Sequence, residues 1–148
     1  MIEVSPDPFY LERFLQAQAG AISAARAEIA AGRKSSHWMW FVFPQIAGLG
    51  SSAMARRYAI GSKAEARAYL AHPVLETRLR ELTASALACP STSAHALFGS
   101  PDDLKFRSCM TLFAAVAEDP APFKSALDRF FAGAPDQATL HRLSTEPL

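Results

Sequence analysis

The chain has 148 residues, of which half are apolar and a fifth are charged, and its formal net charge at pH 7 is +1. The apolar content excludes an intrinsically disordered protein, and the near-neutral charge excludes a general attraction to nucleic acid or to an anionic membrane. The longest apolar run, Trp38 to Phe43, is far shorter than the roughly 20 residues that a membrane-spanning helix needs. We therefore expect neither a membrane nor a nucleic-acid partner.

The two cysteines, Cys89 and Cys109, lie in apolar, helix-like surroundings, and no signal peptide is recognisable before the first predicted helix. Thiols in such settings are typical of reduced, intracellular proteins. We expect a cytoplasmic protein in which Cys109 is a core residue and not a nucleophile.

Helices are predicted throughout, because apolar residues recur at helical spacing, alanine is abundant and no long stretch alternates with a period of two. Asp7–Pro8 and Asp119–Pro120 place a capping residue before a proline, and Ser62–Glu65 and Ser100–Asp103 resemble capping boxes. The predicted helices are one containing Phe9–Leu15, one from Ile22 that stops at Gly32, then Ser51–Tyr58, Lys63–Ala71, Pro73–Ala88, Pro101–Ala117, Pro120–Phe131, and a short one that includes Leu140 and Leu143.

Residues 38–43 are ambiguous between a buried strand and a short buried helix. Ser35 or Ser36 as a helix cap, and Pro44 as a stop, favour the helix. The fold class that follows is all-α: a single compact orthogonal bundle of about seven or eight helices. One domain spans residues 1–148, with its core at about residues 7–143.

Between Glu28 and Glu65 the sequence contains no aspartate or glutamate. The gap holds both tryptophans and a set of cations, namely Arg33, Lys34, Arg56, Arg57 and Lys63. A basic, aromatic-rich segment without carboxylates suits an anionic ligand, so we expect a small anionic molecule, nucleotide-like in type, as the partner.

The run from Arg33 to Ser36 is a candidate phosphate site. Arg33 and Lys34 supply positive charge, while the hydroxyl of Ser36 and nearby backbone N–H groups can donate hydrogen bonds. The alternative is structural, because cations after a helix C-terminus also interact favourably with the helix dipole.

Three further side chains complete the candidate ligand site. His37 could act as a general acid or base or stack on a base, because its pKa lies near neutrality. Trp38 and Trp40 face different sides of a helix, so Trp38 is expected in the core and Trp40 either there or in a pocket. Arg56 and Arg57 point about 100° apart, so at most one of them faces a shared site. No His, Cys or carboxylate set has metal-ligand spacing, and we expect no metal and no cofactor.

Four motifs resemble a bacterial family catalogued as domain of unknown function 1810. They are Gly32–Gln45, Ala53–Ile60, Ala71–Leu75 and Ser100–Ser108, read as GRKSSHWMWFVFPQ, AMARRYAI, AHPVL and SPDDLKFRS. The resemblance covers residues 7 to about 131. It implies a mainly helical single domain and no established activity.

A more distant resemblance concerns Glu12–Gln18, which looks like the Glu-x-aromatic-Phe-Gln-Ala-Gln helix of NADAR-type proteins, followed by Gly32–Arg33 and by Tyr69–Leu75. Those proteins are N-glycosidases that act on ADP-ribose-linked or related nucleotides. The resemblance implies that Glu12 matches the catalytic glutamate, which would stabilise an oxocarbenium-like state or activate water. Otherwise Glu12 is a solvated carboxylate on a helix face.

Two functions therefore compete. In the first, Glu12 is the acid or base of an N-glycosidic hydrolase, with Arg33 and Lys34 holding phosphate and His37 or Trp40 holding the base. In the second, the same basic segment serves a non-catalytic binding or protein-interaction module. The hydrolase requires Glu12 to share a concave pocket with Arg33 and an aromatic side chain.

Overall fold

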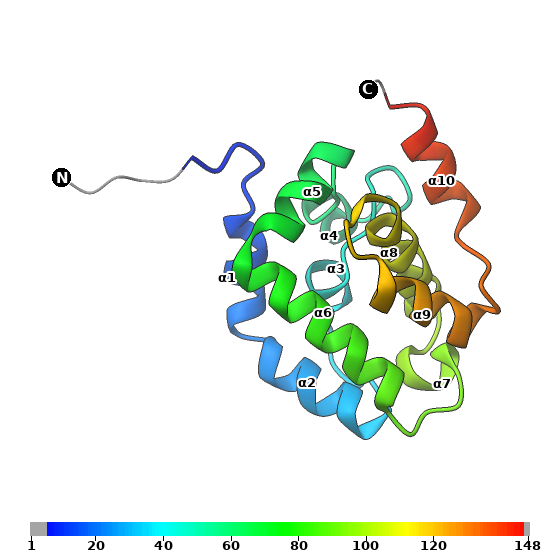
Figure 1. Cartoon of the computed structure of the whole chain (residues 1–148). Helices are drawn as coiled ribbons and strands as arrows, with labels where there is room; N and C mark the ends of the chain where they lie inside the picture. Colours follow the sequence, from blue (N-terminus) through cyan, green and yellow to red (C-terminus); the bar gives the residue numbers. More distant parts are fainter. Residues whose placement is uncertain (1–5, 147–148) are drawn as a thin grey trace.

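Residues 6–146 are described by the structure, a computed structural model. This part of the chain is helical, with extended backbone pairing only at one isolated bridge between Ile46 and Ile60, so the all-α prediction is confirmed. None of the described helices is long and apolar enough to cross a membrane. The helices are α1 (Glu12–Ala19), α2 (Ile22–Ala31), α3 (Met39–Val42), α4 (Ala53–Arg57), α5 (Lys63–Ala71), α6 (Pro73–Ala88), α7 (Ala94–Phe98), α8 (Asp102–Val116), α9 (Ala121–Phe131) and α10 (Gln137–Ser144) (Figure 1).

The described residues thus form ten helices where seven or eight were predicted. Helix α7 was missed because its five residues are too few to display a helical period. Its start was visible in hindsight: Ser93 caps it by accepting a hydrogen bond from the N–H of Ala96. The ambiguous segment contains helix α3 and no strand.

Helix α1 begins at Glu12 and not beside Pro8. Tyr10 has a φ of +51°, a left-handed conformation, so a regular helix cannot run from Pro8 through Tyr10 and begins only after it. The Asp7 carboxylate still serves the helix start, because it accepts hydrogen bonds from the N–H groups of Leu11 and Glu12 at 2.8 and 3.0 Å. Asp7 is not the N-cap, however, because Leu11 occupies that position and makes no side-chain cap, so the predicted cap and the predicted helix start were both wrong.

Aromatic side chains build the core around helix α3, which lies in the interior of the molecule (Figure 1). Phe43 meets the ring of Phe106 edge to face, with centroids 5.1 Å apart, and Phe14 meets Tyr69 in the same way at 5.2 Å. Such contacts stabilise a core beyond simple area burial. The apolar part of the segment 32–45, which begins at Trp38, therefore belongs to the core.

Gln18 links four elements from inside this core. Its side-chain amide donates to the carbonyl of Phe41 at 2.7 Å and to the hydroxyl of Tyr69 at 3.2 Å, and its oxygen accepts from Arg78. Gln18 is itself buried, with 1% of its surface exposed. Its partners satisfy the amide, as a buried polar group requires.

Arg13 holds the N-terminal turn against the segment that leads into helix α5. Its guanidinium forms an ion pair with Glu65 at 2.7 Å, and both side chains are largely shielded from solvent, at 10% and 8% exposed. The same guanidinium donates to backbone carbonyls on both segments, namely those of Phe9, Tyr10, Arg57 and Ala59. The remaining oxygen of Glu65 accepts from the N–H of Gly61.

Candidate functional site

The hydrogen-bond donors of the basic segment converge on one carboxylate, that of Glu28 near the end of helix α2. The N–H groups of Ser35 and Ser36 donate to Glu28 Oε1 at 2.7 and 2.9 Å, and the indole Nε1 of Trp38 donates to the same oxygen at 3.0 Å. The hydroxyl of Ser36 donates to the other oxygen. The groups from which we built a phosphate site thus already surround an internal anion.

These hydrogen bonds stabilise the ionised form of Glu28. Burial raises its pKa, but the bonds from Ser36, Ser35 and Trp38 outweigh that effect and lower the pKa from 4.5 to about 2. Glu28 is therefore charged at any physiological pH. It compensates the positive charge of the segment from inside the fold.

Lys34 and Lys105 share a second carboxylate, that of Asp102 at the start of helix α8. Lys34 Nζ lies 2.9 Å from one oxygen of Asp102, and Lys105 Nζ lies 3.3 Å from the other. Each ammonium also sits 5.1 Å from an indole centroid, Lys34 over Trp38 and Lys105 over Trp40. The capping box predicted at Ser100–Asp103 is not formed: Pro101 precedes the first residue of helix α8, the helix has no side-chain cap, and the Asp103 carboxylate accepts from the N–H of Leu104.

Arg33 and His37 lie at the edge of this cluster with exposed side chains. Gly32, just before them, ends helix α2 in a left-handed conformation, and its N–H donates to Glu28 and Ile29 carbonyls. That agrees with the structural alternative for this stretch. The role of Arg33 and His37 in binding a ligand stays a prediction.

Glu12 lies in a different groove, of about 440 Å³, formed where the N-terminal turn meets the junction of helices α5 and α6. Asp7, Phe9 and His72 line the same groove, whereas Arg33, Lys34 and Arg56 do not. The His72 ring caps helix α6 by accepting from the N–H of Val74 at 3.2 Å. The groove gives Glu12 an aromatic neighbour and no cation to bind phosphate.

Arg56 lines a separate small cavity of about 100 Å³ beside the loop that joins helices α3 and α4. Pro44 ends helix α3, and the chain then pairs with the segment after α4, through Ile60 N–H to Gln45 O and Ala47 N–H to Ile60 O, both at 2.8 Å. This pairing closes the loop that contains α4, and both Gln45 and Arg56 line the cavity beside it. The cavity is lined by Gln45, Ile46, Ala47, Gly48, Gly50, Ala55, Arg56 and Ala59.

Two glycines shape the wall of this cavity. Gly48 has a φ of +97°, and a Cβ there would lie 2.4 Å from the guanidinium carbon of Arg142. A Cβ on Gly50 would lie 2.7 Å from the Cβ of Ala55. Arg142 also donates to the carbonyl of Gly48 at 3.2 Å, which ties the loop to helix α10. At Gly48 the positive φ favours glycine, since the end of the Arg142 side chain could move, whereas at Gly50 a Cβ would press directly on helix α4.

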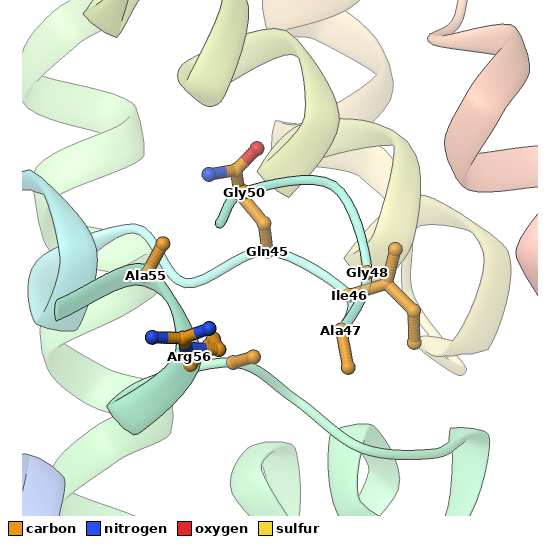
Figure 2. Close-up of a pocket in the computed structure, with 8 residues that line it drawn as sticks. Gln45, Ile46, Ala47, Gly48, Gly50, Ala55 and Arg56 are labelled. Atoms are coloured by element: carbon orange, nitrogen blue, oxygen red, sulfur yellow. The ribbon is translucent and has the colours of Figure 1, made fainter. Parts of the chain in front are cut away.

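The polar groups around the cavity retain unused hydrogen-bonding capacity. Within residues 6–146, neither the Gln45 amide nor the Arg56 guanidinium has a hydrogen-bond or ion-pair partner, and the N–H groups of Gly48 and Gly50 donate to no acceptor. Figure 2 shows the Gln45 side chain pointing toward the loop at Gly50, with Arg56 on the side of helix α4. None of the described residues that line the cavity carries a carboxylate. A cation, an amide and backbone N–H groups around a small space are suited to a phosphate-sized anion.

Of the residues that line this cavity, the sequence analysis named Arg56 as a candidate and did not name Gln45, Gly48 or Gly50. The glycine-rich loop was visible in the sequence, but loops of this composition are common. Only the bridge between Ile46 and Ile60 brings the loop and Arg56 together. Three of the predicted site residues lie around the carboxylates of Glu28 and Asp102, namely Lys34, Ser36 and Trp40. Glu12 and Arg56 line two other, separate cavities.

Fold and site define a class: a small all-helical protein with polar surface cavities and, within residues 6–146, no group of three His, Cys, Asp or Glu side chains placed to hold a metal ion. The chain belongs to the family described as protein of unknown function (DUF1810), whose model matches residues 8–143.

A solved relative has the same fold. The conserved hypothetical protein Rv1873 from Mycobacterium tuberculosis is 46% identical, with a TM-score of 0.93, over 95% of this chain and 100% of that one. No curated protein matches the chain. The first family resemblance is therefore confirmed, whereas these matches lend no support to the NADAR-type resemblance.

Proposed function

We propose that this protein is a non-catalytic binding module for a small phosphorylated anion, which it holds in the cavity between Gln45, the loop 47–50 and helix α4. One observation carries the proposal: the Arg56 guanidinium and the Gln45 amide line one small, carboxylate-free cavity and have no internal partner among residues 6–146. Charge-assisted hydrogen bonds from an arginine are among the strongest that a phosphate can receive. The proposal keeps the protein in the cytoplasm, where its buried cysteines stay reduced.

The Arg33–Ser36 segment is a weaker candidate for the same role. A phosphate bound there would compete with Glu28, whose carboxylate already accepts from Ser35, Ser36 and Trp38. Lys34 would also have to leave Asp102. Displacing a carboxylate that accepts several hydrogen bonds leaves those donors without their partner, which is costly.

An N-glycosidic hydrolase is also less well supported. That mechanism needs a carboxylate at the glycosidic carbon and a phosphate-binding group in the same pocket, because one substrate molecule carries both ends. Glu12 lines a groove that includes none of the proposed phosphate-binding residues. The proposal therefore assigns Glu12 no catalytic role.

Substitution of Arg56 by alanine tests the proposal. At an inorganic phosphate concentration about one hundred times the dissociation constant, the wild-type protein should gain about 2.7 kcal/mol of stability. Loss of one charged hydrogen-bond donor should weaken phosphate binding by about tenfold or more. Thermal unfolding with increasing phosphate, at constant ionic strength set by chloride, measures both effects.

Two matched controls remove the same charge elsewhere. Arg57→Ala removes the neighbouring exposed arginine, whose guanidinium lies 5.5 Å from the ring centroid of Tyr58, and should leave phosphate binding unchanged. Arg33→Ala should leave it unchanged as well. If Arg33→Ala abolished the stabilisation and Arg56→Ala did not, the site would lie at the basic segment and the proposal would be wrong.

A further inference from the structure

A second groove, of about 490 Å³, adjoins the phosphate cavity across the same loop. Gln45, Gly50 and Ala55 line both spaces, so the two lie next to each other with these residues between them. A space of 100 Å³ accommodates little beyond a phosphate, whereas small-molecule sites occupy roughly 300–1,000 Å³. The second groove is therefore large enough for the organic body of a phosphorylated compound.

The walls of this groove differ from those of the phosphate cavity. Leu104 on helix α8 lines it with 55% of its surface exposed, and it offers the groove a large apolar contact. Leu49 and Ala138 add apolar surface. Lys105, held between Asp102 and the Trp40 ring, lies on the same wall. An apolar ligand surface placed on Leu104 would leave water favourably.

Asp136 supplies an acceptor in the groove. One of its oxygens caps helix α10, accepting from the N–H and the hydroxyl of Thr139 at 2.9 and 2.6 Å. Its other oxygen has no donor among residues 6–146. A ligand hydroxyl could donate to that oxygen.

Resting on the proposed function, we infer that the ligand is a phosphate monoester with a nucleoside-like body. Its phosphate lies at Gln45 and Arg56, an apolar ring contacts Leu104, and a hydroxyl donates to Asp136. Lys105, which lines the second groove, adds positive charge near the part of the ligand that joins its phosphate to its ring. A bare sugar phosphate would leave Leu104 exposed.

Binding of three probes by calorimetry tests this inference: inorganic phosphate, ribose 5-phosphate and adenosine monophosphate. In the wild type, adenosine monophosphate should bind about tenfold or more tightly than the other two. Leu104→Ser should remove most of that difference and leave phosphate binding unchanged. Val74→Ser, a change at another exposed apolar residue outside the groove, should alter neither.

The outcomes separate the two proposals. Equal affinity for phosphate and adenosine monophosphate, both lost in Arg56→Ala, would overturn the nucleoside-like body and keep the phosphate site. Adenosine monophosphate binding that Leu104→Ser and Arg56→Ala both leave intact would overturn both proposals. Because Leu104 is exposed, its substitution should not affect folding, which thermal unfolding without ligand verifies.

Discussion

Replacing Glu28 by glutamine should lower the free energy of unfolding at pH 7 by about 3 kcal/mol, because the amide lacks the charge that strengthens these hydrogen bonds and replaces one acceptor oxygen with an NH2 donor. Those donors come from Ser35, Ser36 and Trp38, which connect the end of helix α2 to the start of α3. Urea unfolding, followed by tryptophan fluorescence, measures the change. The matched control is Glu81→Gln, which breaks an exposed pair with Arg26 and should cost less than about 1 kcal/mol.

The effect of Glu28 should also depend on pH in a defined direction. Its pKa is lowered on folding, from 4.5 to about 2, so its charge stabilises the folded state fully above pH 4.5. As pH falls from 4.5 towards 2, the wild type loses this contribution and Glu28→Gln does not. The difference in stability between them should therefore narrow over that range. A constant difference down to pH 2 would mean that Glu28 acts through its shape and not through its charge.

Replacing Arg13 by alanine should be the most damaging single change, with a loss of about 4 kcal/mol, because it leaves the Glu65 carboxylate in a buried position without its counter-ion. The change also removes the donor to four backbone carbonyls that hold residues 9–10 against residues 57–59. Circular dichroism during urea unfolding measures the loss.

Arg26→Ala is the control for this effect. Arg26 also pairs with a glutamate, Glu81, but its side chain is 45% exposed, so its removal should cost less than about 1 kcal/mol. Similar losses in the two variants would show that burial does not govern the strength of the Arg13 pair.

The local parts of the fold were predictable from sequence where a helix carries its own signal. Ser62 accepts from the N–H of Glu65 as a capping box requires, and Gly32 ends helix α2 as predicted. Helix α1 was misplaced because Tyr10 adopts a left-handed conformation, with its carbonyl held by the Arg13 guanidinium. The same guanidinium donates to the carbonyl of Arg57, 44 positions away, and no local sequence pattern reports such a contact.

The candidate site was less predictable for a similar reason. The absence of carboxylates between Glu28 and Glu65 was correctly observed, but its meaning depends on how the chain folds back. Glu28, at one end of the gap, accepts hydrogen bonds from Ser35, Ser36 and Trp38. Glu65, at the other end, accepts from Arg13 and Gly61. The two flanking carboxylates therefore pair with donors inside the gap and, for Arg13, with one outside it. Sequence spacing gives the residue types, whereas their pairing is a property of the tertiary structure.

Helix α4 has a consequence for motion. It buries none of its side chains, although it carries Arg56, and it is attached through the Ser52 cap, the Ile46–Ile60 bridge and the bond from Arg13 to Arg57. A segment with so little buried surface opens locally at a small free-energy cost. Its amide hydrogens should therefore exchange with solvent long before those of the buried helix α3. One wall of the phosphate cavity would then open and close without the core unfolding. An anion that contacts both Gln45 and Arg56 would slow the hydrogen exchange of helix α4.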